Sequence, residues 1–86
     1  MKKIVIISAV WCHACLTMRK RNKALKEKYP EWTWVDFDLD LDDELVEPLK
    51  VGKLIPVYII YENDTEVKRI AGEMSLDALE SELTHV

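Results

Sequence analysis

The feature that most constrains the fold is an uninterrupted run of β-branched residues near the start of the chain, Ile4-Val5-Ile6-Ile7. A strand with one face in water alternates apolar and polar residues, whereas an all-apolar run is typical of a strand covered on both faces. The sequence therefore predicts a strand over 2–8 inside a sheet that has helices on both sides. The length of 86 residues predicts one domain over 1–86.

Periodic patterns along the rest of the chain predict three helices and three further strands. Residues 13–29 show helical periodicity, which ends at Pro30 because the residue before a proline disfavours the helical conformation. The further strands are predicted over 32–38, 57–61 and 65–70. A short helix is predicted over 42–50, where Pro48 should shorten or bend it and Gly52 is its expected stop, and a last helix from Ser75 to Thr84. The residues expected to face the core are Ala14, Met18, Leu25 and Tyr29 in the first helix and Leu76, Leu79 and Leu83 in the last.

The order of these elements, β-α-β-α-β-β-α, predicts an α/β fold. The first two strands are joined through a helix, so we expect them to be parallel with a right-handed crossover. The last two are joined by a short turn at 62–64, so we expect an antiparallel hairpin. The sequence therefore predicts a four-stranded mixed sheet flanked by helices on both faces.

Two cysteines, Cys12 and Cys15, lie where the first strand passes into the first helix. A thiolate is the attacking species in disulfide exchange, and an unperturbed Cys has a pKa of about 8.5. The N-terminus of a helix presents free N–H groups and a partial positive charge, which stabilise a Cys12 thiolate. Cys15 lies one turn inside, close enough to form a disulfide with Cys12, and is expected to be the more buried. The pair predicts a nucleophile, Cys12, and a resolving thiol, Cys15.

A Cys-x-x-Cys motif also occurs as half of a zinc site, which needs four ligands. The sequence has no further Cys, and its imidazoles are His13 and His85. His13 lies between the cysteines, where its side chain is poorly placed to join them at one metal ion. We therefore expect neither a metal nor another cofactor.

Four short motifs follow one another along the chain. They are Trp11-Cys12-His13-Ala14-Cys15, Val35-Asp36-Phe37-Asp38, Ile55-Pro56, and Ala71-Gly72 with Ser75-Leu76. In this order they resemble the active-site segment, the second strand, the cis-proline signature and the C-terminal segment of the thioredoxin family. In length the chain is closer to small thioredoxin-like and glutaredoxin-like redoxins. The resemblance implies a thioredoxin-like fold and thiol-disulfide oxidoreductase activity.

The resemblance also implies roles for residues around the Cys pair. Pro56 would lie against both cysteines, with a cis peptide bond that exposes the backbone of Ile55 to a substrate strand. From the residues alone, Pro56 is also compatible with the start of an ordinary strand. The further candidates for substrate binding or modulation are Trp11, His13, Ala14, Ala71 and Gly72, and the apolar residues Val10, Ile55 and Ala71 predict a shallow docking groove beside Trp11.

The sequence departs from the thioredoxin pattern at positions that bear on the redox potential. His13-Ala14 replaces the usual Gly-Pro, and a cation beside a thiolate stabilises the reduced form. We hypothesise a potential above that of ordinary thioredoxins; the alternative is an exposed His13 with little effect. The family's buried Asp, its accompanying Lys and its mid-helix proline correspond here to Ile6, about Trp34 and about Lys20.

Charge and hydropathy restrict the partners and the location. The formal net charge of -4 disfavours nucleic acid. No stretch approaches the about 20 apolar residues of a membrane span, and Met1 to Val10 only faintly imitates a signal peptide. We therefore expect a cytoplasmic monomer that binds no membrane. Basic residues cluster in the first helix, where a solvated face is one interpretation and a site for an anion or an acidic partner is the other: Arg19, Lys20, Arg21, Lys23, Lys26 and Lys28.

Three functions remain open on the sequence alone. The first is an electron-transport enzyme that exchanges disulfides with protein substrates and receives electrons from a reductase or a low-molecular-weight thiol. The second is a glutathione-coupled, glutaredoxin-like protein, although the paired glycines that glutaredoxins use for glutathione are missing. The third is a non-catalytic adaptor whose cysteines sense redox state or bind metal.

Overall fold

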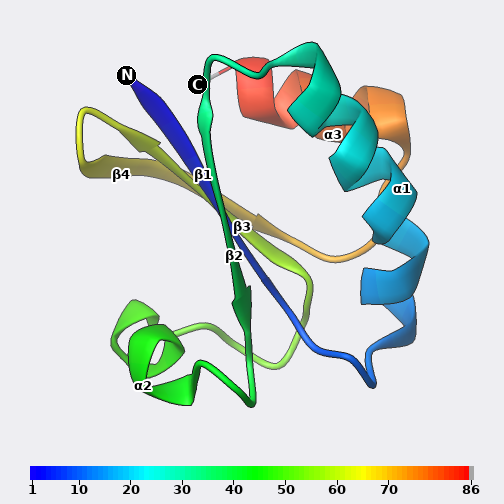
Figure 1. Ribbon diagram of the computed structural model, residues 1–86, viewed down its shortest axis with the longest axis vertical. Helices are drawn as coiled ribbons and strands as arrows, with labels where there is room; N and C mark the ends of the chain where they lie inside the picture. Colours follow the sequence, from blue (N-terminus) through cyan, green and yellow to red (C-terminus); the bar gives the residue numbers. More distant parts are fainter. Residues whose placement is uncertain (86) are drawn as a thin grey trace.

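Four strands form one mixed sheet in the order β2-β1-β3-β4 (Figure 1). The strands are β1 (Lys2–Ser8), β2 (Thr33–Asp38), β3 (Val57–Glu62) and β4 (Thr65–Ala71). β1 pairs parallel with β2 and antiparallel with β3, and β3 pairs antiparallel with β4. The computed structural model describes residues 1–85. The predicted α/β fold with a four-stranded mixed sheet is confirmed.

The sheet is centred on the apolar run of β1. Ile4 and Ile6 pack on one face of the sheet, and Val5 and Ile7 pack on the other. All four side chains are buried, as expected for a strand that has neighbours on both sides and cover above and below.

Helices cover both faces of the sheet, as the sequence predicts (Figure 1). One face is packed against α1 (His13–Lys28) and α3 (Leu76–Thr84), and the other against α2 (Asp43–Val46) and the 3-10 turn Glu47–Leu49. None of the helices in residues 1–85 is long and apolar enough to cross a membrane.

The α1/α3 face contains the largest buried side chains. Met18 and Leu25 of α1 are fully covered, and between them Asn22 accepts a hydrogen bond of 2.5 Å from the Tyr58 hydroxyl. In α3, Leu79 and Leu83 are buried, but Leu76 is 38% exposed. The prediction that Leu76 faces inward is wrong because this first residue of the helix lies at the margin of the core.

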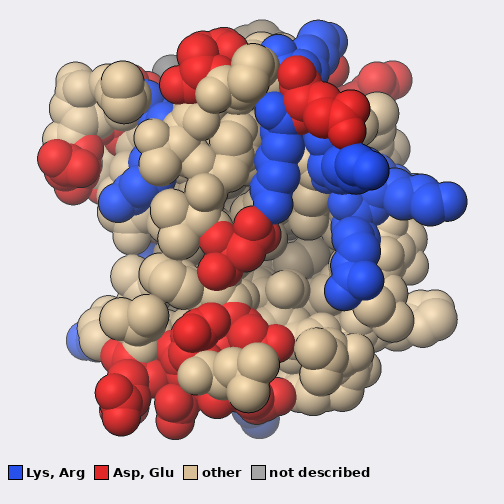
Figure 2. All heavy atoms as spheres, in the orientation of Figure 1, with Lys and Arg blue, Asp and Glu red and all other residues tan. Residues whose placement is uncertain are grey.

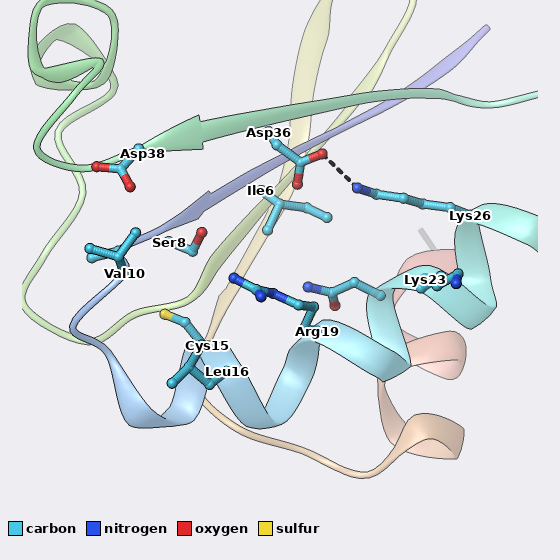
Figure 3. A pocket seen from close by; sticks show the side chains of 12 residues that line it. Ile6, Ser8, Val10, Cys15, Leu16, Arg19, Lys23, Lys26, Asp36 and Asp38 are labelled. Carbon is cyan, nitrogen blue, oxygen red and sulfur yellow. Dashed lines mark hydrogen bonds and ion pairs between the residues drawn. The ribbon is translucent and has the colours of Figure 1, made fainter.

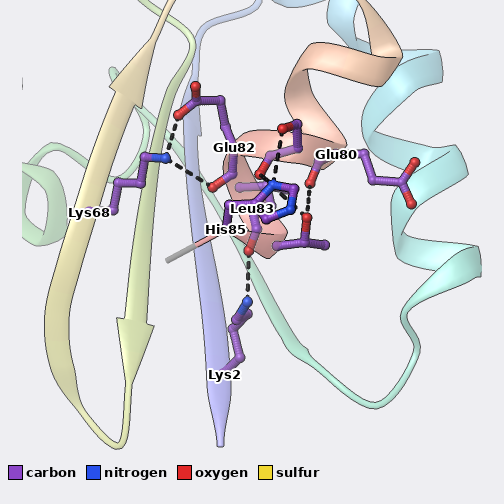
Figure 4. A network of polar contacts seen from close by, with 8 residues as sticks. Lys2, Lys68, Glu80, Glu82, Leu83 and His85 are labelled. Carbon is purple, nitrogen blue, oxygen red and sulfur yellow. Dashed lines mark hydrogen bonds and ion pairs between the residues drawn. The ribbon is translucent and has the colours of Figure 1, made fainter.

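Hydrogen bonds fix both ends of α3. The Ser75 hydroxyl accepts from the Ala78 N–H at 3.1 Å, which satisfies one of the free donors of the first turn. At the other end, Lys2 donates to the Leu83 carbonyl at 2.7 Å, and Lys68 forms an ion pair with Glu82 (Figure 4). Cations at the C-terminal carbonyls are favoured by the helix dipole.

The connection between β2 and β3 is helical, and Pro48 shortens the helix as predicted. The range 42–50 divides into the short α2 and a 3-10 turn, because Pro48 lacks the N–H that a continuing α-helix needs. The stop is Lys50, which adopts a left-handed conformation with φ of 53°, and not Gly52. The predicted β3–β4 hairpin is confirmed, and Asn63 and Asp64 supply the positive φ angles of its tight turn.

Candidate active site

Cys12 lies at the junction of β1 and α1 and caps the helix. Its backbone is extended, its N–H donates to the Ala9 carbonyl at 3.1 Å, and its sulfur accepts from the Cys15 N–H at 3.2 Å. The Cys12 sulfur thus occupies the position of a capping oxygen, at the positive end of the helix dipole. A negative charge on this sulfur is stabilised by the same N–H group and dipole.

The Ile55–Pro56 segment faces the Cys12 sulfur from the start of β3. The Cys12 thiol donates to the Ile55 carbonyl at 3.7 Å, and the peptide bond between Ile55 and Pro56 is cis. Both residues are buried. Gly72 supports the segment, since its N–H donates to the Pro56 carbonyl at 2.9 Å.

Gly72 is one of two glycines in the chain, and its conformation requires glycine. Its φ is 97°, a region that L side chains rarely adopt. A Cβ at this position would lie 3.4 Å from the Leu54 side chain. The backbone path that brings the end of β4 beside Pro56 therefore depends on the absence of a side chain here.

The two cysteines are equally covered, and each is 7% exposed. The prediction that Cys15 is the more buried is therefore wrong, because Ile55 and the β1–α1 turn cover Cys12 as well. Burial, followed by the hydrogen bond with Cys12, raises the pKa of Cys15 from 9.0 to about 11. Cys15 is therefore a neutral thiol at pH 7, as a resolving thiol is before its reaction.

The surface around Cys12 combines apolar and acidic groups. Trp11 is 62% exposed, and its indole N–H donates to the Asp40 carboxylate at 2.7 Å. Val10 and Leu54 are also exposed. Trp11 and Val10 are predicted from the sequence, whereas Asp40 and Leu54 are not, since neither stands in a motif and only the folded chain brings them to this surface.

The other predicted site residues lie nearby in different settings. His13 and Ala71 are exposed, and Ala14 is half-buried. Within residues 1–85 the His13 ring makes no hydrogen bond and no ion pair. The structure therefore brings Cys12, Cys15, Ile55 and Pro56 together, and places His13 at the rim.

The strand pairing identifies the residue opposite Ile6. Ile6 pairs with Asp36, and Trp34, which the resemblance places at about the position of the family's lysine, pairs with Ile4. Asp36 forms an ion pair of 2.5 Å with Lys26 of α1. Within residues 1–85 no polar or charged side chain is buried, and no group of three or more His, Cys, Asp or Glu residues is placed to hold a metal ion.

The site is a Cys-x-x-Cys pair that starts a helix and faces a cis-proline. It lies on a four-stranded mixed sheet covered on both faces. This combination defines a thioredoxin-like redoxin. The family model described as Thioredoxin matches residues 1–85. The chain belongs to the thioredoxin family.

Two curated relatives are similar over most of this chain. A thioredoxin from Ophiophagus hannah is 28% identical over 69 residues, which are 80% of this chain and 65% of the relative. Thioredoxin H5 from Oryza sativa subsp. japonica is 32% identical over 72 residues, which are 83% of this chain and 53% of the relative. The matched region thus spans less than two thirds of either relative.

Solved structures show the same fold. The thioredoxin NaTrxh from Nicotiana alata has a TM-score of 0.88 at 25% identity, covering 98% of this chain and 71% of that one. Fasciola hepatica thioredoxin has a TM-score of 0.88 at 24% identity, covering 98% of this chain and 79% of that one.

Proposed function

We propose that the protein is a thiol-disulfide oxidoreductase that exchanges disulfides with protein substrates through Cys12 and Cys15. The observation that carries the proposal is the Cys12 sulfur, which accepts at 3.2 Å from the N–H of Cys15, the residue that holds the second thiol. Thiolate stabilisation and a neighbouring resolving thiol are the two requirements of disulfide exchange.

The reaction has two steps. The Cys12 thiolate attacks one sulfur of the substrate disulfide, so that a Cys12–substrate disulfide forms and the other substrate sulfur leaves as a thiolate. Cys15 then loses its proton and attacks the Cys12 sulfur. The second substrate sulfur leaves and is protonated, and the protein holds a Cys12–Cys15 disulfide. The substrate gains two electrons, which the two protein thiols supply.

The neighbouring residues have supporting roles in this proposal. The backbone of Ile55 pairs with an extended substrate segment, and Pro56 holds that backbone beside Cys12. Gly72 supports Pro56, and Trp11 and Ala71 contribute exposed contact surface next to the sulfur. His13 and Ala14 stand between the cysteines, where His13 raises the reduction potential when it is protonated. A His13→Gly variant with an unchanged potential in a glutathione redox titration contradicts this role of His13.

We place the reaction in the cytoplasm, where a catalytic rather than a structural cysteine pair is expected. The protein acts as a monomer of one domain, and a reductase or a low-molecular-weight thiol supplies its electrons. Fractionation of cells and sedimentation of the purified chain test the first two statements. Coupling to glutathione and glutathione reductase, compared with coupling to thioredoxin reductase, distinguishes the electron donors.

The activity is tested by reduction of insulin with dithiothreitol, which is followed by turbidity. We expect the wild-type chain to accelerate precipitation and Cys12→Ser to give the uncatalysed rate. Cys15→Ser should accumulate a mixed disulfide between Cys12 and the substrate, detected by mass spectrometry. A wild-type chain that does not accelerate the reaction overturns the proposal, and a mixed disulfide trapped on Cys15 in Cys12→Ser alone overturns the assigned order of attack on protein substrates.

A further inference from the structure

A groove of about 350 Å³ lies between the segment 50–54 and the end of β4, and we call it the Leu54 groove. Its volume is at the lower end of the about 300–1,000 Å³ range of pockets that hold ligands. Ala71, which the sequence predicts in a docking groove, is one of its residues. The apolar part of its lining is formed by Val51, Leu54, Val57, Ile70 and Ala71.

The Leu54 groove is continuous with the proposed substrate surface. Leu54 directly precedes Ile55, whose carbonyl lies 3.7 Å from the Cys12 sulfur. Successive residues of an extended strand are about 3.3 Å apart. A substrate segment that pairs with the Ile55 backbone therefore reaches the groove within one or two residues of its own cysteine.

Hydrogen bonds and packing hold the segment 50–54 against the end of β4. Arg69 of β4 donates to the carbonyls of Leu49 and Lys50 at 2.7 and 3.3 Å, which fixes the start of the segment. At its other end, the Leu54 side chain lies 3.4 Å from the position that a Cβ on Gly72 would take. The groove is therefore formed before a substrate binds, so little ordering of the protein accompanies binding.

The lining of the Leu54 groove leaves apolar surface open to a partner. Leu54 is 63% exposed, and Ala71 is exposed as well. Val51 and Ile70 are half-buried, and Val57 is buried. A substrate side chain in the groove would remove this surface from water, which favours an aliphatic or aromatic residue.

The charged residues of the Leu54 groove are cationic. Lys50, Lys53 and Arg69 line it, and within residues 1–85 no acidic residue does. Arg69 is held by Glu66 at 2.8 and 2.9 Å, whereas Lys50 and Lys53 are exposed and make no ion pair in this part of the chain. Lys50 also borders a separate hollow with Glu47, which Lys53 does not line. The ammonium group of Lys53 thus complements a carboxylate in this groove.

The other exposed neighbour of the nucleophile carries the opposite charge. Trp11 directly precedes Cys12 and donates to the Asp40 carboxylate at 2.7 Å. Figure 2 shows acidic side chains gathered over the α2 region and Lys and Arg side chains gathered over α1. Cys12 therefore has an acidic group at Trp11 and a cationic groove at Leu54. Such an uneven field favours a substrate segment whose acidic end lies in the groove.

A second groove, of about 360 Å³, lies beside Cys15 between α1 and the ends of β1 and β2 (Figure 3). Its charges are mixed, since Arg19 and Lys23 line it together with Asp38. None of residues 50–57 lines it, so a segment that pairs with Ile55 does not meet it first. The Leu54 groove is therefore the one placed to select protein substrates.

We propose that the Leu54 groove is a specificity site for the protein substrate, which takes an aliphatic or aromatic side chain with an acidic residue beside it. Both lie within two residues of the substrate cysteine. The apolar side chain covers Leu54, and the carboxylate pairs with Lys53 and Lys50. The inference rests on the proposed function, because it concerns the segment that pairs with Ile55. It changes no step of the exchange and decides which disulfides react fastest with Cys12.

The first experiment measures how fast the reduced protein reduces disulfide-linked dimers of short peptides, followed by tryptophan fluorescence. The peptides are Glu-Leu-Cys-Leu-Glu, Gln-Leu-Cys-Leu-Gln and Lys-Leu-Cys-Leu-Lys, and each rate is divided by that of dithiothreitol with the same peptide. The Glu peptide should react about two- to five-fold faster than the Gln peptide, the range that one surface charge pair supports. The Lys peptide should be slowest, and salt should reduce the differences.

Two variants that remove the same charge test the role of Lys53. Lys53→Gln should lower the ratio of the Glu-peptide rate to the Gln-peptide rate by the same two- to five-fold. Lys20→Gln removes an exposed charge from α1 that lines neither groove, and should keep the ratio of the wild type. An unchanged ratio in Lys53→Gln, or an equal fall in Lys20→Gln, overturns the proposal.

Two truncations test the apolar contact. Leu54→Ala should slow reduction of the Gln-Leu-Cys-Leu-Gln peptide about two- to five-fold relative to a peptide with Ser in place of Leu. Val67→Ala shortens an exposed side chain of β4 outside the groove and should leave this ratio unchanged. Equal slowing of both peptides by Leu54→Ala would make Leu54 a support of the backbone. A dimer in sedimentation that dissociates in Leu54→Ala would assign the groove to a second copy. Either result overturns the proposal.

The inference can fail while the proposed function stands. A wild type that reduces every peptide at the same normalised rate overturns the specificity site and leaves disulfide exchange intact. A wild type that reduces none of the peptides and does not accelerate insulin reduction overturns the proposed function, and the inference with it.

Discussion

The two faces of the sheet differ in how completely they are covered. The α1/α3 face is formed by residues that are 0–2% exposed and carries the Tyr29, Trp32 and Trp34 rings at its edge. The α2 face is covered by a helix of four residues and a 3-10 turn, and includes both cysteines in its core. On α2 and the loop before it, Leu41 and Leu45 remain exposed.

The α1/α3 face contributes mainly to stability, whereas the α2 face carries the reactive thiols. The α1/α3 face holds long side chains in full contact, where each lost methylene leaves a cavity. The α2 face ends at the Cys pair, where a sulfur must meet a substrate and the cover must be thin. We infer that the free energy of unfolding resides mainly in the α1/α3 face, and the following predictions compare the two faces.

The largest loss of stability is expected from the first of two Leu→Ala substitutions, one on each face of the sheet. Leu79→Ala removes a fully buried side chain from the α1/α3 face and should lower the free energy of unfolding by about 2–5 kcal/mol. Leu49→Ala acts on a half-buried side chain packed against the α2 face and should cost about 1 kcal/mol. Urea unfolding measures both. Equal costs would remove the proposed asymmetry between the faces.

The second effect is a pH dependence that arises at the Cys pair. The pKa of Cys15 is raised from 9.0 to about 11, so the folded state binds the proton more tightly than the unfolded state. The resulting stability is fully present below pH 9 and is lost as the pH rises towards 11, on the order of 2 kcal/mol in total.

A comparison of reduced wild type with Cys15→Ser isolates this contribution, because serine does not titrate in the range. Between pH 8 and 11, the free energy of unfolding measured with denaturant should fall more steeply for the wild type than for the variant. If it fell in parallel for both proteins, Cys15 would titrate alike in the folded and unfolded states.

A smaller loss of stability is expected at Gly72, and the same substitution at Gly52 serves as its control. Gly72→Ala should destabilise by about 1–2 kcal/mol, because its φ of 97° is strained for any residue with a Cβ. It should also weaken the support of Pro56 and so reduce insulin reduction. Gly52→Ala meets nothing within 4 Å and should change stability by at most about 1 kcal/mol. A Gly72→Ala variant as stable as Gly52→Ala would contradict the role of the backbone conformation.

The smallest loss of stability is expected when the hydrogen bonds of two tryptophan side chains are removed. Trp34→Phe removes a donor to the Tyr29 carbonyl at a half-buried position of the α1/α3 face and should cost about 1 kcal/mol. Trp11→Phe removes the donor to Asp40 at an exposed position and should cost about 0.5 kcal/mol or less. Thermal unfolding of both variants measures these costs. A larger loss of stability in Trp11→Phe than in Trp34→Phe would assign a structural role to the exposed ring.

Local patterns in the sequence predicted the parts of the fold that depend on near neighbours. The run Ile4–Ile7, the helix after Cys12 and the hairpin around Asn63 are each defined by periodicity or turn chemistry within a few residues. The errors occur where distant segments meet. Leu76 continues a helical stripe but lies at the margin of the core, and Cys15 lies one turn inside α1 but is no more covered than Cys12.

The sequence by itself determined the Cys12–Cys15 pair, its place at the start of a helix and the order of the helices and strands along the chain, because these follow from spacing and periodicity. Only the tertiary structure decided that both cysteines are equally covered, that Asp36 lies opposite Ile6, and that Asp40 reaches Trp11. It also decided that Lys53 and Leu54 border a groove at the end of β4. Strand register and the packing of α1 on the sheet fix these contacts, and both depend on side chains that are far apart in the sequence.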